Sequence, residues 1–124
     1  MSGRGEIRLA LPCGKDAPAQ ARSALRDFVQ EWNGGQELSY MAQLAITEAL
    51  SEFLERHGES PQETMGIRAV FADGRLHIVI EGIALTNFVD SLRLRIVEAV
   101  TDELSFEIDP AGETLAVSFT FPRE

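Results

Sequence analysis

The sequence predicts an α+β fold, a two-layer α/β sandwich in which a mixed or antiparallel sheet of about five strands carries three helices on one face. Segments in which apolar and polar residues alternate occur at both ends of the chain and in its middle, as in strands with one buried face. Segments with apolar residues three or four positions apart lie between them, as in amphipathic helices. The resulting order is strand, helix, helix, strand, strand, helix, strand, strand.

The first strand and the first helix are predicted before residue 33. Residues 6–11 alternate in polarity and predict the strand. Asp16 is expected to cap the helix that follows, with Pro18 in its first turn. The helix places apolar side chains on one face, namely Ala21, Leu25, Phe28 and Trp32. The Asn-Gly-Gly run at 33–35 is expected to end it.

The second helix, predicted for residues 38–57, is the element around which the chain is organised. Its broad apolar stripe is formed by Ala42, Ile46, Ala49, Leu50, Phe53 and His57. Gly58 is expected to stop it. Glu48 and Glu52 lie one turn apart on a neighbouring face, where like charges cost the helix a few tenths of a kcal/mol. This pair is either part of a solvated face or part of a functional site.

A β-hairpin is predicted in the middle of the chain. Residues 59–63 are expected to form a polar loop. Alternating residues then follow at 67–71 and 76–80, and Asp73-Gly74 lies between them. Both turn positions tolerate positive φ, which a tight hairpin turn requires.

The C-terminal part predicts one helix and two strands. Residues 81–87 are expected to be irregular, and Thr86 or Asn87 is expected to cap the helix. The side chains predicted to face the core from this helix are Val89, Leu92, Ile96 and Val100. Residues 104–108 and 115–121 alternate in polarity and predict the last two strands.

Length and composition favour one soluble domain spanning residues 1–124. The net charge of −9 argues against nonspecific nucleic-acid binding, which requires clustered basic residues. No run of eighteen apolar residues is present, so no membrane span is expected, and no apolar signal segment is seen. Cys13 is the only cysteine, so no internal disulfide can form, and a cytoplasmic location is expected.

The sequence contains no metal or triad motif that spacing alone can support. His57, His77 and Cys13 lie too far apart for a zinc signature. His57 is expected to interact with the end of its helix, and His77 is expected to face solvent. No Ser-His-Asp or Cys-His arrangement follows from the spacing.

The order of elements and the central helix resemble the GHKL ATPase fold, also called the Bergerat fold. More narrowly, they resemble the anti-sigma-factor serine/threonine kinases of bacterial partner-switching systems. The sharpest match is the run Thr-Glu-Ala-Leu-Ser-Glu at 47–52, where the family has Ser or Thr, Glu, Ala, an aliphatic residue, a small residue and Asn. Arg-His-Gly at 56–58 and the segment 96–106 resemble further family features. The resemblance covers nearly the whole chain.

The resemblance implies roles for both glutamates of the second helix. Glu48 matches the family's glutamate that activates the attacking hydroxyl, so it would be the general base of an active kinase. Glu52 stands where the family has the asparagine of the magnesium site. A carboxylate oxygen can bind Mg²⁺, but a second acid beside a triphosphate adds repulsion when the metal is absent.

The adenine-reading box departs from the family pattern. The family's aspartate corresponds to Glu81, whose extra methylene shifts the carboxylate by about an ångström. Gly82 is retained, and Ala84 replaces the next glycine of the box.

The second glycine box corresponds to residues 91–94, and both of its glycines are absent. Ser91 and Arg93 place side chains where bare backbone N–H groups should meet the phosphates. The segment between Gly82 and Ser91 is short for a lid that closes over ATP. The nucleotide-binding candidates are therefore Glu52, Glu81, Gly82, Ser91 and Arg93, in a site that we interpret as degraded.

The favoured hypothesis is a bacterial regulatory protein that binds a sigma factor or a STAS-type anti-anti-sigma partner without a cofactor. The alternative is an active serine/threonine kinase that uses ATP and Mg²⁺, with Glu48 as general base and Glu52 as metal ligand. A third possibility is a scaffold with no partner-switching role. A homodimer is possible in each case, because members of this family often pair.

Overall fold

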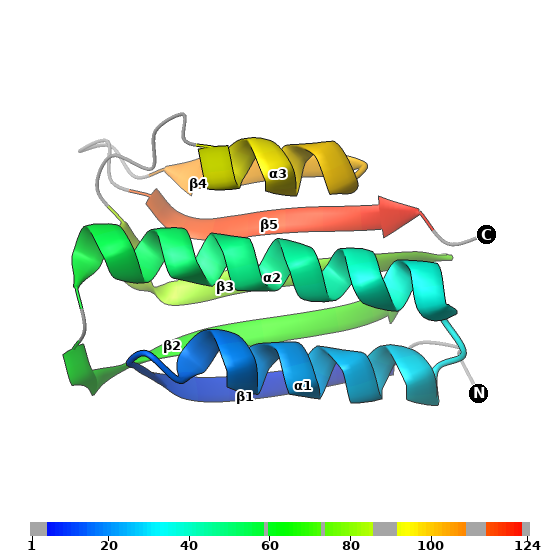
Figure 1. Ribbon diagram of the computed structural model, residues 1–124, viewed down its shortest axis with the longest axis horizontal. Coiled ribbons are helices and arrows are strands. Elements are labelled where there is room, and N and C mark those ends of the chain that lie inside the picture. Colours follow the sequence, from blue (N-terminus) through cyan, green and yellow to red (C-terminus); the bar gives the residue numbers. More distant parts are fainter. Residues whose placement is uncertain (1–4, 59, 73, 86–91, 109–113, 123–124) are drawn as a thin grey trace.

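The computed structural model describes residues 5–58, 60–72, 74–85, 92–108 and 114–122. The elements, in chain order, are β1 (Gly5–Cys13), α1 (Ala17–Glu31), α2 (Gln36–His57), β2 (Ser60–Ala72), β3 (Arg75–Leu85), α3 (Leu92–Val100), β4 (Glu103–Ile108) and β5 (Thr114–Pro122). The five strands form one sheet in the order β1-β2-β3-β5-β4, and each neighbouring pair is antiparallel. The three helices lie on one side of this sheet (Figure 1). The predicted fold class is confirmed.

The core lies between the sheet and the helices. Alternate side chains of β2 and β3 point into it, as the alternating sequence pattern predicts. The largest side chains that are fully buried there include Leu25, Ile46, Phe53, Phe71, Ile78 and Phe121. Burying one such side chain stabilises the fold by about 1.5–3 kcal/mol. The core therefore ties α1 and α2 to the centre of the sheet.

The helix ends follow the predicted signals in part. Asp16 occupies the N-cap position of α1, but its side chain makes no capping hydrogen bond, so that prediction is wrong. The backbone N–H of Ala17 instead donates to the carbonyl of Gly14 at 3.0 Å. Gly58 ends α2 with φ of 86°, a left-handed conformation that glycine adopts without strain.

The β2–β3 hairpin forms as predicted, with Ala72 paired to Arg75 and Gly74 at φ of 72°. Asp73 lies outside the described residues. Both strands extend further than the sequence suggested. β2 already begins at Ser60, where a loop was predicted, because it pairs with the end of β1 through an irregular register at Cys13.

The distal end of β3 also differs from the prediction of an irregular segment. β3 continues to Leu85, where it pairs with Thr114 of β5 after a register shift beyond Glu81. Cross-strand hydrogen bonds supply the order here, since the local sequence has no clear alternation.

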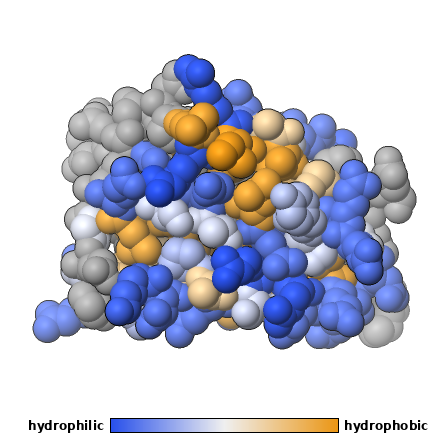
Figure 2. Space-filling view, viewed as in Figure 1, coloured by the Kyte–Doolittle hydropathy of each residue, from blue (hydrophilic) through white to orange (hydrophobic). Residues whose placement is uncertain are grey.

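The third helix buries a different face from the one predicted. Leu94 and Val97 are buried, whereas Leu92 is 76% exposed. Ile96 and Val100 lie at the border of the buried face. In the space-filling view of the helix side, hydrophobic residues gather at the level of α3 (Figure 2). The other predicted features of this helix, Val89 and the caps Thr86 and Asn87, lie outside the described residues.

Ion pairs join the C-terminal part to the rest of the chain. Arg75 of β3 donates a hydrogen bond to Asp102, which precedes β4. Asp102 also donates its backbone N–H to the carbonyl of Thr120 at 2.8 Å.

In the part of the chain that the structure describes, no helix is long and apolar enough to cross a membrane.

Candidate functional site

One flank of α2 carries three carboxylates, on Glu48, Glu52 and Glu55. Their spacings of four and three residues place them along the same side of the helix. Glu48 is half-buried, Glu55 is exposed, and Glu52 is 4% exposed. Among the residues whose burial the structure describes, Glu52 is the only buried polar or charged one. A carboxylate taken out of water in this way requires a compensating partner.

Arg93 of α3 supplies a cation to this flank. Its Nη1 donates a hydrogen bond to Oε2 of Glu55 and lies 3.8 Å from Oε1 of Glu52. The hydrogen bond to Glu55, with the charges of Glu55, Glu48 and Glu52, raises the pKa of Arg93 above its ordinary value. The guanidinium is therefore charged at all working pH values and links α3 to α2. We refer to Glu48, Glu52, Glu55 and Arg93 as the acidic cluster.

Within the acidic cluster, the buried Glu52 is expected to affect the stability of the fold most. An exposed ion pair such as Glu55–Arg93 typically contributes about 0–1 kcal/mol. A buried carboxylate that loses its cationic neighbour leaves charge uncompensated, which costs considerably more. The interpretation of Glu48 and Glu52 as a solvated face is therefore wrong for Glu52, because α3 packs over that part of α2.

Glu81 lies apart from the acidic cluster. In β3 the preceding Ile80 is buried on the helix side, and Glu81 is exposed. Its Cγ lies 3.5 Å from the position that a Cβ on Gly66 would occupy, next to it in β2. Because side chains alternate along a strand, Glu81 lies on the sheet face opposite to the helices. The structure thus does not bring Glu81 together with Glu48 and Glu52.

The remaining candidates are placed in part. Gly82 follows Glu81 within β3. Ser91 lies outside the described residues. The sequence places Glu55 on the same helix face as Glu48 and Glu52, but its spacing alone predicts no role for it in a site.

The described residues contain no group of three or more His, Cys, Asp or Glu side chains that could hold a metal ion. Cys13 is buried, and burial, followed by the charge of Glu63, raises the pKa of its thiol. A buried thiol with a raised pKa is a poor nucleophile, in agreement with a packing role.

Two hollows lie away from the acidic cluster. One, of about 590 Å³, is formed by α1, the α1–α2 turn and the first turns of α2, and it contains Arg26, Ser39, Tyr40 and Gln43 among its lining residues. The other, of about 660 Å³, lies on the sheet face away from the helices and includes Arg68, Val70 and His77. Neither is lined by Glu48, Glu52 or Arg93.

Comparison with known proteins gives a similarity in structure only. No family model matches the sequence, and no curated protein matches it. The structure is similar to the RsbU and RsbW domains of Rv1364c from Mycobacterium tuberculosis, with a TM-score of 0.76 and 18% identity over 96% of this chain and 32% of that chain. This chain therefore spans about a third of that matched chain.

A second similar structure is that of the SiaB–SiaC complex from Pseudomonas aeruginosa. The TM-score is 0.66 at 10% identity, over 93% of this chain and 88% of the matched chain. The similarity to the chain with the RsbU and RsbW domains agrees with the predicted fold. At these identities, what is shared is the fold.

Proposed function

We propose that residues 1–124 form a single regulatory domain with the fold of an anti-sigma-factor serine kinase, which acts by binding a partner protein rather than by nucleotide chemistry. The observation that carries the proposal is the position of Arg93. Its guanidinium is hydrogen-bonded to Glu55 and lies 3.8 Å from the buried Glu52 carboxylate. The acidic cluster therefore already contains its own cation.

This arrangement does not fit Mg-ATP. If Glu52 stood for the family's metal ligand, a magnesium ion would have to displace Arg93, the cation beside that carboxylate. Without magnesium, a triphosphate bound in place of Arg93 would meet the three carboxylates of the cluster, and the like charges would repel. A side chain at 93 also occupies a position where the resemblance places phosphate-binding backbone. The position of Glu81 also argues against ATP binding. Glu81, the predicted adenine contact, lies on the sheet face opposite to the helices, whereas Glu52, the predicted metal ligand, lies on α2.

The partner that fits best is a sigma factor or a STAS-type anti-anti-sigma protein. The support is the fold, which is similar to RsbW and to a chain from the two-protein SiaB–SiaC complex. The net charge of −9 favours a partner with a basic contact surface. A cytoplasmic location is part of the proposal, because a sigma factor acts there, and a homodimer is compatible with it.

A second candidate is an active serine/threonine kinase. Glu48 favours it, because its carboxylate is only half-buried and lies on the flank where the family's general base is expected. In that case Arg93 would leave Glu55 to bind a phosphate oxygen. Transfer of phosphate from labelled ATP to a partner serine, abolished in Glu48→Gln, would establish this candidate.

Calorimetric titration with Mg-ATP tests the proposal directly. We expect no saturable binding at micromolar nucleotide for the natural chain. The double variant Arg93→Gly, Glu52→Asn restores the family residues at both positions and is the informative comparison. Arg95→Gly is the matched control, because Arg95 is an exposed arginine of the same helix. Micromolar binding of Mg-ATP by the natural chain would overturn the proposal.

A further inference from the structure

The flank of α2 that faces α1 holds a groove with no role in the function proposed above. Its volume of about 590 Å³ falls within the range of binding sites in proteins. The lining residues are Arg26, Gln30, Asn33, Gly35, Gln36, Ser39, Tyr40 and Gln43. They come from the second half of α1, the connecting turn and the first turns of α2. We refer to this site as the α1–α2 groove.

The chemistry of the groove contrasts with the rest of the chain. None of these eight lining residues carries a carboxylate, although the protein has a net charge of −9. Arg26 is the one charged residue among them, and four of the others are carboxamides: Gln30, Asn33, Gln36 and Gln43. Each carboxamide offers both a donor and an acceptor, the same combination that a peptide main chain presents.

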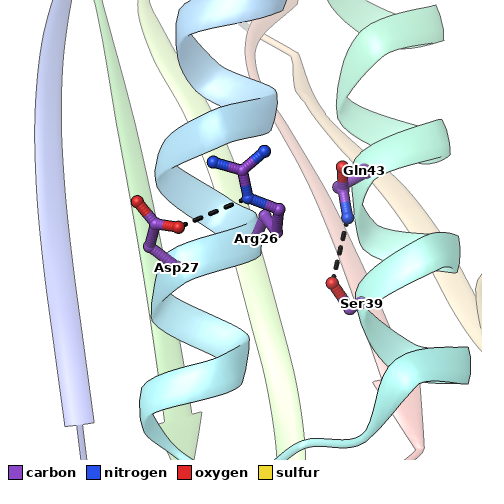
Figure 3. A network of polar contacts seen from close by, with 4 residues as sticks. All are labelled: Arg26, Asp27, Ser39 and Gln43. Atoms are coloured by element: carbon purple, nitrogen blue, oxygen red, sulfur yellow. Dashed lines mark hydrogen bonds and ion pairs between the residues drawn. The ribbon is translucent and has the colours of Figure 1, made fainter.

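Each of the two helices that form the groove carries one hydrogen bond that involves a lining residue (Figure 3). On α2, Nε2 of Gln43 donates to Oγ of Ser39 at 3.0 Å. On α1, Nε of Arg26 donates to Oδ1 of Asp27 at 3.3 Å. The Arg26–Asp27 pair is exposed and long, so it holds the guanidinium only weakly and a ligand carboxylate can compete for it.

The rim of the groove carries an aromatic ring that the chain itself leaves largely uncovered. Tyr40 is 66% exposed and lies between Ser39 and Gln43 in the lining. Tyrosine and arginine are enriched among the residues that dominate binding energy at protein interfaces. A groove whose lining contains an exposed tyrosine, an arginine and several carboxamides is therefore typical of a protein-binding surface.

We propose that the α1–α2 groove binds an extended segment of a partner protein that contains Asp or Glu. The carboxylate pairs with Arg26, the main chain exchanges hydrogen bonds with the carboxamides, and a neighbouring apolar side chain packs on Tyr40. Arg26 is the only charged side chain among the eight lining residues, so a carboxylate of the segment has a cation to pair with and meets no carboxylate of the lining.

Selection from a displayed library of random peptides tests the proposal. We expect enriched peptides to carry an acidic residue at a fixed position. Their affinity, measured by fluorescence anisotropy on synthetic copies, should fall about tenfold or more in Arg26→Ala and in Tyr40→Ala. Arg22→Ala is the matched control, because Arg22 is an exposed arginine one turn earlier on α1 and does not line the groove. All three variants change exposed side chains, so each should remain folded.

Three outcomes would overturn the proposal. One is the absence of peptides enriched on the natural protein over an Arg26→Ala, Tyr40→Ala double variant. Another is binding that survives both single substitutions. The third is displacement of the peptide by inorganic phosphate at equal concentration, which would indicate an anion site instead. None of these readouts involves nucleotide binding, so failure here is distinct from failure of the proposed function.

Discussion

The two flanks of α2 differ in the side chains that the neighbouring helix places against them. Toward α3, the guanidinium of Arg93 lies among the carboxylates of Glu48, Glu52 and Glu55, so the acidic cluster contains its own compensating charge. Toward α1, neutral side chains and Arg26 leave a groove of about 590 Å³. The flank with the stronger charge pattern is thus the satisfied one, and the flank with little charge is open. Charge density in a sequence is therefore a poor guide to which surface is free to bind.

The largest expected effect is on the closed flank. Arg93→Ala leaves the Glu52 carboxylate buried without its nearby cation, so we expect a loss of about 1–3 kcal/mol in the free energy of unfolding. Urea denaturation measures this. Adding Glu52→Gln to Arg93→Ala should recover part of the loss, because it replaces the buried negative charge with a neutral amide. An unchanged stability in Arg93→Ala would mean that the cluster is not closed as described.

A smaller effect is expected at the exposed member of the cluster. Glu55→Gln should lower the free energy of unfolding by roughly half a kcal/mol, since the pair with Arg93 is solvent-exposed. The difference from the natural protein should shrink in molar salt, which screens exposed charges. A loss of stability as large as that of Arg93→Ala would show that Arg93 stabilises the fold through Glu55 and not through Glu52.

On the open flank, Asp27→Asn should increase the affinity for an acidic peptide about twofold, because the carboxylate that competes for Arg26 is removed. Anisotropy titration of a selected peptide measures this change. In an Arg26→Ala background, Asp27→Asn should have no effect on peptide affinity, which makes a double-mutant cycle the control. Weaker binding in Asp27→Asn would contradict the assignment of the carboxylate to Arg26.

The smallest effect concerns stability on the open flank. Tyr40→Ala should change the free energy of unfolding by no more than a few tenths of a kcal/mol, because the side chain is mostly exposed. Chemical denaturation of this variant beside Arg93→Ala gives the direct comparison of the two flanks. A large loss in Tyr40→Ala would show that the groove serves the fold.

Most of the fold could be predicted because its signals are local. The alternation around Gly74 and the apolar stripes of α1 and α2 each reside in a short segment. The structure confirms the hairpin, the buried face of α1 and the stripe of α2 from Ala42 to Phe53, whereas the side chain of His57 lies outside the described residues. The exposure of Leu92 could not be predicted, because a short helix shows several apolar faces and packing selects one. The early start of β2 depends on pairing with β1, a contact between distant parts of the chain.

The candidate site divides in the same way. The spacing of Glu48 and Glu52 is readable from the sequence, and so is their position on one flank of α2. The burial of Glu52 is not, because it depends on how α3 packs over α2, and these two helices are far apart in the sequence. The α1–α2 groove carries no sequence signal at all, since glutamines and asparagine there are ordinary surface residues.

Ion pairs between distant parts of the described chain connect residues 92–122 to residues 5–85: Arg75 with Asp102, and Arg93 with Glu55 and Glu52. The same two parts are joined by the backbone ladder between β3 and β5. The last quarter of the chain is thus attached partly by electrostatic contacts, and its transient opening should respond to ionic strength. Amide hydrogen exchange in α3 and β4 should then accelerate with added salt, while exchange in α1 should remain constant.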